Sequence, residues 1–118
     1  TPVMMHSIDE AGRIVDVNQY WLDVMGYERS EVLGRPSGDF LTPESRRLEA
    51  EVYLPAFWRE GRLDTIEYQY VRKDGAVFDA ALSAVVADDP DAPNKTSLAF
   101  VVDISERKRI EREQRELR

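Results

Sequence analysis

The sequence predicts an α+β domain in which short helices cover one face of a five-stranded antiparallel sheet. The first observation behind this is the order of the segments: two strand patterns at the start, short helical patterns in the middle and three strand patterns at the end. The second is the stretch FVVDISERKRIERE (100–113), which changes from an apolar strand pattern to a charged helical pattern. The sequence therefore also predicts a C-terminal helix that has little to bury.

The chain opens with a predicted hairpin followed by a helix. Strands are expected at 3–8 and 13–17, because the polar run between them, at 10–12, ends in glycine and reads as a turn. Asn18 suits a helix N-cap, since its side chain can accept a hydrogen bond from an amide of the first turn. The helix is expected to end at Gly26, because glycine readily takes the left-handed conformation of a C-cap.

Two further helical segments are expected before the second half of the chain. Residues 28–34 predict a single short turn of helix. A longer helix begins at Pro43, because proline suits the first helical position, and ends at Gly61. Pro55 is expected to kink or interrupt this helix, since proline lacks an amide donor and clashes one turn back. Val52 is placed on its apolar, inward face.

The second half of the chain predicts three antiparallel strands. The first two, at 64–72 and 76–87, alternate apolar and polar side chains on either side of the turn KDG (73–75). Asp-Gly favours a hairpin turn, because the turn requires a positive φ. A polar loop broken by prolines is expected at 88–96, before the last strand at 97–104.

Composition limits the classes of function. The 118 residues are 42% hydrophobic and 33% charged, which indicates one soluble globular domain. The net charge of -7 argues against nucleic-acid binding, and no apolar run approaches the roughly 18 residues of a membrane span. A cytoplasmic location is the default expectation, and the start at Thr1 indicates a piece of a longer chain. Residues 106–118 carry a net charge of +2 and few apolar side chains, which places a boundary near Ser105.

Five blocks of the sequence resemble, in order and spacing, those of PAS sensory domains of bacterial signal-transduction proteins. The blocks are DEAGRIVDVN (9–18), MGYERSEVLGR (25–35), DFLTPES (39–45), VRKDGAVFD (71–79) and FVVDISERKR (100–109). The resemblance implies a PAS fold with strand order 2-1-5-4-3, curved around a small cavity under the helices. It also implies a sensory domain at 1–105, followed at 106–118 by the start of a linker or coiled-coil helix toward an effector domain.

The resemblance further implies a signal-relay site where the last strand meets the C-terminal helix. The sequence DIS at 103–105 stands at the Asp-Ile-Thr motif of the family, and serine keeps the hydroxyl group of threonine. Asp103 and Ser105 are expected to form hydrogen bonds at this junction, with Ser105 as the N-cap of the helix that follows. Asp74 and Gly75 of the hairpin turn complete the expected relay set. The alternative is that Asp103 and Ser105 only cap the helix.

The resemblance also directs a set of apolar and aromatic side chains toward the cavity. These candidates are Trp21, Leu22, Met25, Val52, Ile66, Tyr68, Tyr70, Phe78, Ala80, Leu82, Ala84, Ala99 and Val101. The small alanines among them leave room for a small-molecule ligand, and the tyrosine hydroxyl groups are the expected polar contacts. The alternative is a filled core, in which the large aromatic side chains, Trp58 included, take up the same space.

The residues argue against the known cofactors of PAS domains. The chain has no cysteine, which both the flavin adduct of photochemical domains and the thioester-linked chromophore of photoactive yellow proteins need. Haem needs an axial ligand, usually a histidine on the long helix, whereas the one histidine, His6, lies on the first predicted strand. His6 is therefore expected to be an ordinary strand residue. We expect no cofactor, with non-covalently bound flavin the least excluded.

Catalytic and metal sites are not expected. One histidine and no cysteine provide no pairing of a nucleophile with a base. Carboxylates are plentiful on the long helix, as at Glu44, Glu49 and Glu51, and many of them are expected on its solvated face, which argues against a catalytic pair. The stretch DDPDAPN (88–94) lacks the glycine and the spacing of an EF-hand loop, so no calcium site is predicted.

Two functions remain open. The first is a sensory module that detects a small molecule or a conformational input and relays it to an effector such as a histidine kinase, diguanylate cyclase or phosphodiesterase. The second is a ligandless module for dimerisation or protein interaction, favoured by the outward side chains of Val71, Ala81 and Val85. A homodimer through the outer sheet face and the flanking helices is compatible with both functions.

Overall fold

The computed structural model of the chain describes residues 2–87, 91 and 94–117. Five antiparallel strands form one sheet in the order β2-β1-β5-β4-β3. The strands are β1 (Met4–Ile8), β2 (Ile14–Val17), β3 (Arg62–Val71), β4 (Val77–Ala87) and β5 (Thr96–Asp103). The predicted α+β class and strand order are confirmed.

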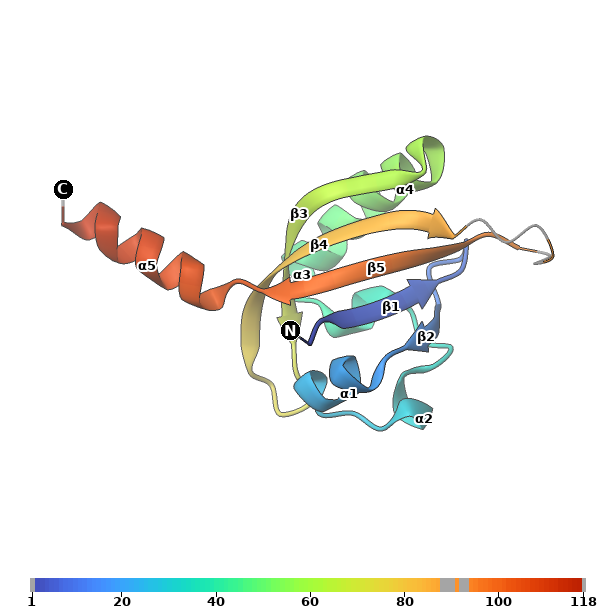
Figure 1. The fold of residues 1–118 in the computed structure, drawn as a ribbon, viewed down its shortest axis with the longest axis horizontal. Helices are drawn as coiled ribbons and strands as arrows, with labels where there is room; N and C mark the ends of the chain where they lie inside the picture. Colours follow the sequence, from blue (N-terminus) through green and yellow to red (C-terminus); the bar gives the residue numbers. More distant parts are fainter. Residues whose placement is uncertain (1, 88–90, 92–93, 118) are drawn as a thin grey trace.

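The helices between β2 and β3 form a layer against the sheet, and the last helix lies apart from it. The helical elements are α1 (Gln19–Met25), α2 (Arg29–Val32), the 3-10 turn η1 (Ser37–Phe40), α3 (Pro43–Leu48), the π-helical turn η2 (Glu49–Tyr53), α4 (Leu54–Glu60) and α5 (Ser105–Glu116). Figure 1 shows that the sheet curves over the layer of α1 to α4, whereas α5 extends away beyond the end of β5. No residue of α5 is buried.

Asn18 joins the first hairpin to the helix layer. Its Oδ1 accepts hydrogen bonds from the amides of Trp21 at 2.9 Å and Met5 at 3.1 Å, and its Nδ2 donates to the Val3 carbonyl at 2.8 Å. The bond from Trp21 is the predicted N-cap, and the other two hold the cap to the start of the chain and β1. Gly26 then ends α1 at a φ of 83°, as predicted. These contacts place α1 beside β1, with Trp21 in the interior.

The segment 43–60 stays helical throughout but changes its type of helix. Residues 49–53 form a π-helical turn directly before α4. Pro55 lies near the start of α4 and, because it has no amide hydrogen, cannot donate a hydrogen bond to the preceding turn. The interruption predicted at Pro55 is therefore a change in helical winding rather than a break in the helix.

The inward face of this segment differs from the prediction. Val52 is 48% exposed and is not an interior residue, whereas Ser45, Glu49 and Phe57 are buried. Ser45 Oγ accepts a hydrogen bond from the Gln69 amide of β3 at 2.8 Å, so this face meets the sheet. The apolar pattern indicated the wrong face because two residues of the true inward face are polar.

Part of the predicted loop cannot be compared with the prediction. The loop expected at 88–96, and the stretch 88–94 that was weighed as a calcium site, fall largely outside the described residues. Within the part of the chain that the structure describes, no three acidic, histidine or cysteine side chains are grouped as metal ligands. In that same part, no helix has both the length and the apolar character needed to cross a membrane.

Candidate functional site

The predicted cavity residues mostly lie in the interior. Eleven are buried: Trp21, Leu22, Met25, Tyr68, Tyr70, Phe78, Ala80, Leu82, Ala84, Ala99 and Val101. Ile66 is partly buried and packs against this core, and the exposed Val52 is the exception. The alternation of inward and outward side chains along β3 and β4 was therefore a reliable guide to the interior, whereas the face of the long helix was not.

Aromatic side chains fill most of this interior. The rings of Trp21 and Phe40 meet edge to face at 5.3 Å between centroids. Tyr70 and Phe78, on adjacent strands, stack at 5.6 Å with an interplanar angle of 16°. Such pairs contribute packing energy beyond the area that they bury.

Two small cavities remain between these side chains. One of about 20 Å³ is bordered by Phe57, Tyr68, Ala84 and Ala99 among others, and one of about 10 Å³ is bordered by Trp21 and Tyr70 among others. Each has room for about one water molecule. Two of the three predicted small residues, Ala84 and Ala99, line the larger cavity, and Ala80 does not.

His6 and Glu49 line both cavities, although neither was among the predicted cavity residues. Glu49 is only 9% exposed, which corrects its predicted place on the solvated helix face. Its Oε2 accepts a hydrogen bond from Ser37 Oγ at 2.8 Å. Gly38 lets the Glu49 and Arg46 side chains come close, because a Cβ there would lie 2.9 Å from Arg46 Cγ and 3.2 Å from Glu49 Oε1.

His6 lies on β1 as predicted. Its side chain is buried and borders both cavities. It is 8% exposed and shares the inward face of β1 with Met4 and Ile8, because inward and outward side chains alternate along the strand. That alternation was visible in the sequence and is the signal that would have placed His6 inside. His6 Nδ1 and Trp21 Nε1 are both buried without a hydrogen-bond partner.

Burial shifts the protonation equilibria of the interior groups. It lowers the pKa of His6 from 6.5 to about 4, because the positive charge is disfavoured away from water. It raises the pKa of Glu49, because a negative charge is also disfavoured away from water. The hydrogen bond from Ser37 and the charge of Arg46 oppose this rise. Burial, followed by the nearby charge of Glu49, also raises the pKa of the Tyr68 and Tyr70 hydroxyls.

The junction between β5 and α5 is built around the main chain of Asp79 in β4. The Ile104 amide donates to the Asp79 carbonyl at 2.8 Å, and Ser105 Oγ accepts from the Asp79 amide at 3.1 Å. Asp103 Oδ1 accepts from the Ser105 amide at 2.8 Å. Asp103 and Ser105 thus form hydrogen bonds at the junction, but Ser105 is the first residue of α5 and binds β4 instead of capping the helix from outside.

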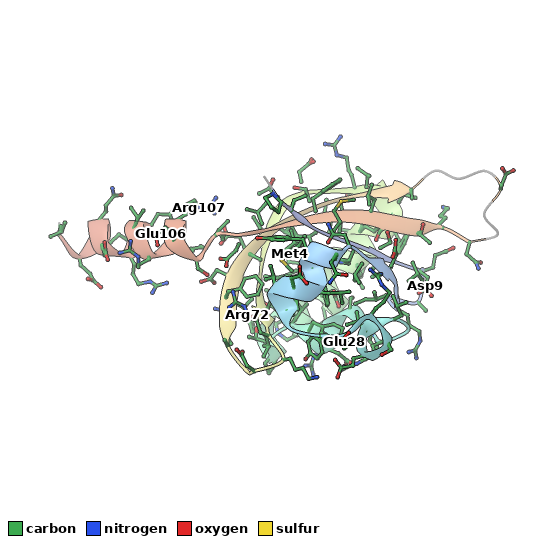
Figure 2. The ribbon with its side chains drawn as sticks, turned by 60° about the horizontal axis from the view of Figure 1, so that its bottom comes forward. Met4, Asp9, Glu28, Arg72, Glu106 and Arg107 are labelled. Carbon is green, nitrogen blue, oxygen red and sulfur yellow. The ribbon has the colours of Figure 1, made fainter. Side chains whose placement is uncertain are left out.

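Arg72 connects this junction to the aromatic interior. Its Nη2 lies 3.8 Å from Asp103 Oδ2, and its guanidinium carbon lies 4.9 Å from the centroid of the Phe78 ring. Figure 2 labels Arg72 at the edge of the sheet and Arg107 on α5. Because Phe78 stacks on Tyr70, a continuous set of contacts runs from the smaller cavity to the start of α5.

Asp74 and Gly75 form the turn that precedes β4. Asp74 Oδ1 accepts from the Ala76 amide at 2.8 Å, and Gly75 takes a φ of 90° that favours glycine. The Gly75 amide donates to the Arg72 carbonyl at 2.9 Å. These contacts are local to the turn, and the neighbouring Arg72 is the residue that contacts Asp103.

Glu67 of β3 provides a second attachment for α5. Its Oε1 lies 2.5 Å from Lys108 Nζ, and its Oε2 lies 3.7 Å from Arg107 Nη2. Arg107 also lies 3.6 Å from Glu111, one turn further along the helix. The first turns of α5 are therefore joined to the outer part of the sheet by exposed ion pairs, which sequence reasoning did not anticipate.

The outer face of the sheet carries exposed apolar side chains. They are Val15, Val77, Val85, Phe100 and Val102, each between 39% and 53% exposed. A groove of about 230 Å³ crosses this region between Arg62, Val85 and Phe100. A second groove, of about 310 Å³, lies between Tyr20 of α1 and Asp103 at the end of β5.

The curved sheet, its strand order and the helix that continues from the last strand agree with the fold that the PAS resemblance implies. The model of the PAS domain family matches residues 2–106, and the chain belongs to this family. No match was found among curated proteins.

Solved PAS domains share the fold of this chain. The PAS domain of an HTR-like protein from Haloarcula marismortui is 28% identical with a TM-score of 0.71, over 88% of this chain and 83% of that one. The PAS domain of a protein from Colwellia psychrerythraea is 20% identical with a TM-score of 0.76, over 88% and 87%. A PAS domain from a two-component sensor histidine kinase is 15% identical with a TM-score of 0.71, over 86% and 84%.

Proposed function

We propose that this PAS domain is a non-catalytic sensory module that relays a change in its interior to an effector through the junction at 103–105 and α5. The observation that supports this most directly is the pair of hydrogen bonds at the main chain of Asp79, whose carbonyl accepts from the Ile104 amide and whose amide donates to Ser105 Oγ. Asp79 belongs to β4, the strand whose inward residues Leu82 and Ala84 line the larger cavity. A shift of β4 on ligand entry therefore moves the start of α5.

A second connection runs along the aromatic pair. Tyr70 lines the smaller cavity and stacks on Phe78, which lies under the Arg72 guanidinium. Arg72 is in turn within ion-pair distance of Asp103. Both connections end at the same short segment, so the junction combines the movements of β4 and of the β3–β4 turn.

The effector proposed for this module is a histidine kinase, with a diguanylate cyclase or phosphodiesterase as the alternatives. The resemblance in fold to a PAS domain from a sensor histidine kinase supports the first of these. The absence of cysteine from the sequence supports sensing without a covalently attached chromophore, and the place of His6 on β1, away from the long helical segment, supports sensing without haem. The proposed signal is therefore a small molecule or a conformational input.

The relay is tested by filling the cavity and measuring amide hydrogen exchange in α5. Ala84→Leu adds bulk to the larger cavity, which Ala84 lines, and should change the exchange rates of residues 105–117. Ala81→Leu is the matched control, because Ala81 lies on the same strand with its side chain on the opposite face. Asp103→Ala should abolish the response to Ala84→Leu while costing less than about 1 kcal/mol of unfolding free energy, since Asp103 is exposed.

Two results would contradict the relay. One is a folded Ala84→Leu variant whose α5 exchanges as in the unchanged protein. The other is a response that persists in full in the Asp103→Ala background. Either result would leave the domain as a PAS fold but remove the junction from its mechanism.

A ligandless dimerisation module is the second candidate, favoured by the exposed apolar side chains of the outer sheet face. Val85, Phe100 and Val102 lie on the paired strands β4 and β5, where a second copy would cover them. Phe100→Ser should then lower the fraction of dimer in sedimentation experiments, whereas Val52→Ser, on the helix side, should not. A wild-type chain that stays monomeric at high concentration would exclude this candidate.

A further inference from the structure

Among the described residues, four buried side-chain polar atoms lack a hydrogen-bond partner, and two of them belong to residues that line the smaller cavity. His6 Nδ1 and Trp21 Nε1 are both enclosed, in residues that are 8% and 1% exposed. Buried polar groups in folded proteins nearly always have a partner, because losing contact with water is costly unless a new bond replaces it. Both residues line the smaller cavity, so this space is a candidate position for a partner of the two atoms.

His6 and Glu49 separate the smaller cavity from the larger one. Both side chains border both cavities. Displacement of these two side chains would join the spaces into one site, bordered by Trp21 at one end and by Ala84 and Ala99 at the other. Glu49 lies on the π-helical turn, an irregular form of helix that is frequent at functional sites.

The charges around this joined site determine what it can hold. Neither cavity is lined by Lys or Arg among the described residues, and Glu49 is the one acidic side chain that borders them. Arg46 is near enough for its charge to oppose the rise in the pKa of Glu49, but it borders neither cavity, and its Nε donates to the Gly38 carbonyl at 2.9 Å. The low pKa of His6 keeps its ring neutral at pH 7. An anionic ligand would therefore meet the Glu49 carboxyl group, with no cationic side chain bordering the site to bind it.

A cation is also a poor match for the unpartnered groups. The Trp21 indole N–H can only donate a hydrogen bond, so its partner must be an acceptor. A simple ammonium or amidinium ion has donors alone. The neutral His6 ring and the Glu49 carboxyl, by contrast, can accept hydrogen bonds from a ligand donor.

Resting on the proposed sensory function, we propose that this site binds a compact, uncharged molecule with one hydrogen-bond acceptor and one donor, of the class of primary amides and small alcohols. The ligand acceptor receives a hydrogen bond from Trp21 Nε1. The ligand donor forms hydrogen bonds to His6 and Glu49. Because each cavity alone holds about one water molecule, the ligand enters only as the His6 and Glu49 side chains move apart. Glu49 bonds to Ser37, and Tyr70 lines the same space, so ligand entry perturbs the aromatic pair that leads to Arg72.

Three probes of nearly the same shape and different charge test this ligand class. They are acetamide, acetate and acetamidinium. The readout is the indole N–H resonance of Trp21 in ¹⁵N-labelled protein, with that of the partly buried Trp58 as an internal control. Acetamide should shift the Trp21 resonance with saturation and a dissociation constant on the order of millimolar, as expected for so few atoms. Acetate and acetamidinium should bind at least about tenfold more weakly, a difference of about 1.4 kcal/mol.

Two variants assign the contacts. Trp21→Phe removes the donor and should weaken acetamide binding at least about fivefold, followed through the methyl resonances of Ala84 and Ala99. Trp58→Phe is the matched control and should leave binding unchanged, because Trp58 lines neither cavity. The titration of the wild-type chain decides the ligand class even if a variant fails to fold.

The outcomes separate this inference from the sensory function itself. If no probe gives a saturable shift, or acetate or acetamidinium binds as well as acetamide, the proposed ligand class is wrong. If acetamide gives no saturable shift while Ala84→Leu still alters amide exchange in α5, the relay is supported and the proposed ligand class is wrong. If acetamide binds at Trp21 and neither acetamide nor Ala84→Leu changes amide exchange in α5, the binding site is supported and the relay is wrong.

Discussion

The interior and α5 are held in place by opposite kinds of contact. The interior depends on apolar packing, with Trp21, Phe40 and Phe57 each only 1% exposed. In contrast, α5 has no buried residue, and the polar contacts of Ser105 and Glu67 attach it to the sheet. Dense packing favours one arrangement, whereas exposed ion pairs contribute little free energy each. The angle of α5 can therefore change without unfolding the domain, as the proposed relay requires.

Removing a large interior side chain should have the greatest effect on stability. Phe57→Ala is expected to lower the free energy of unfolding by about 3–5 kcal/mol, because it deletes a buried ring and leaves a cavity. Leu117→Ala, at the end of α5 and 87% exposed, should change it by less than about 0.5 kcal/mol. Urea denaturation of both variants makes the comparison. Similar effects would show that α5 is more strongly packed than its exposure indicates.

The buried histidine should make the stability of the interior depend on pH. The pKa of His6 is lowered from 6.5 to about 4, so the unfolded chain binds a proton at higher pH than the folded one. Stability that is present above pH 6.5 is then lost as the pH falls toward 4, by about 3 kcal/mol.

His6→Gln lacks this titration. The difference in unfolding free energy between wild type and variant should therefore shift in favour of His6→Gln by about 3 kcal/mol over that range. Surface carboxylates titrate equally in both proteins and cancel in the difference. Parallel pH profiles would show that His6 is not enclosed as described.

Removing the bond between α5 and β4 should have a smaller effect on stability and a larger one on α5. Ser105→Ala leaves the Asp79 amide without its partner and should cost about 1 kcal/mol. Amide exchange at 105–117 should become faster while exchange in β1 stays unchanged. Ser105→Thr keeps the hydroxyl and should behave like the wild type. If the two variants do not differ, the hydroxyl is not what attaches the helix.

The exposed ion pairs should give the smallest effect. Glu67→Gln removes the partner of Lys108 and Arg107, and should cost less than about 1 kcal/mol of unfolding free energy. It should still widen the distribution of distances between spin labels placed on α5 and on the sheet, and added salt should broaden the wild-type distribution in the same direction. Glu111→Gln, which loses only a pair within α5, is the control. Equal broadening in both variants would exclude Glu67 as an attachment.

The fold was predictable from short stretches of sequence because each element carries its own signal. Alternating side chains mark β3 and β4, Asn18 marks the start of α1, and Gly26 marks its end. The PAS motifs then supplied the strand order, which local patterns alone do not contain. Most of the interior followed from this alternation, since a strand has a period of two residues.

The candidate site was only partly predictable. Glu49 was expected in solvent, because a carboxylate on a helix gives no sign that a π-helical turn and the close approach at Gly38 will enclose it. The partner of Ser105 is Asp79, 26 residues earlier in the chain, and that of Lys108 is Glu67. Contacts at such separations depend on which strands become neighbours.

The sequence by itself therefore determined the elements, their order, the apolar lining of the interior and the position of the junction. These features depend on periodicity, caps and turns, which act within a few residues. Only the tertiary structure decided that His6, Trp21 and Glu49 share one enclosed space, and that Arg72 and Glu67 reach the start of α5. Burial and pairing of polar groups depend on packing between distant segments, and this packing sets both the chemistry of the interior and the attachment of the helix.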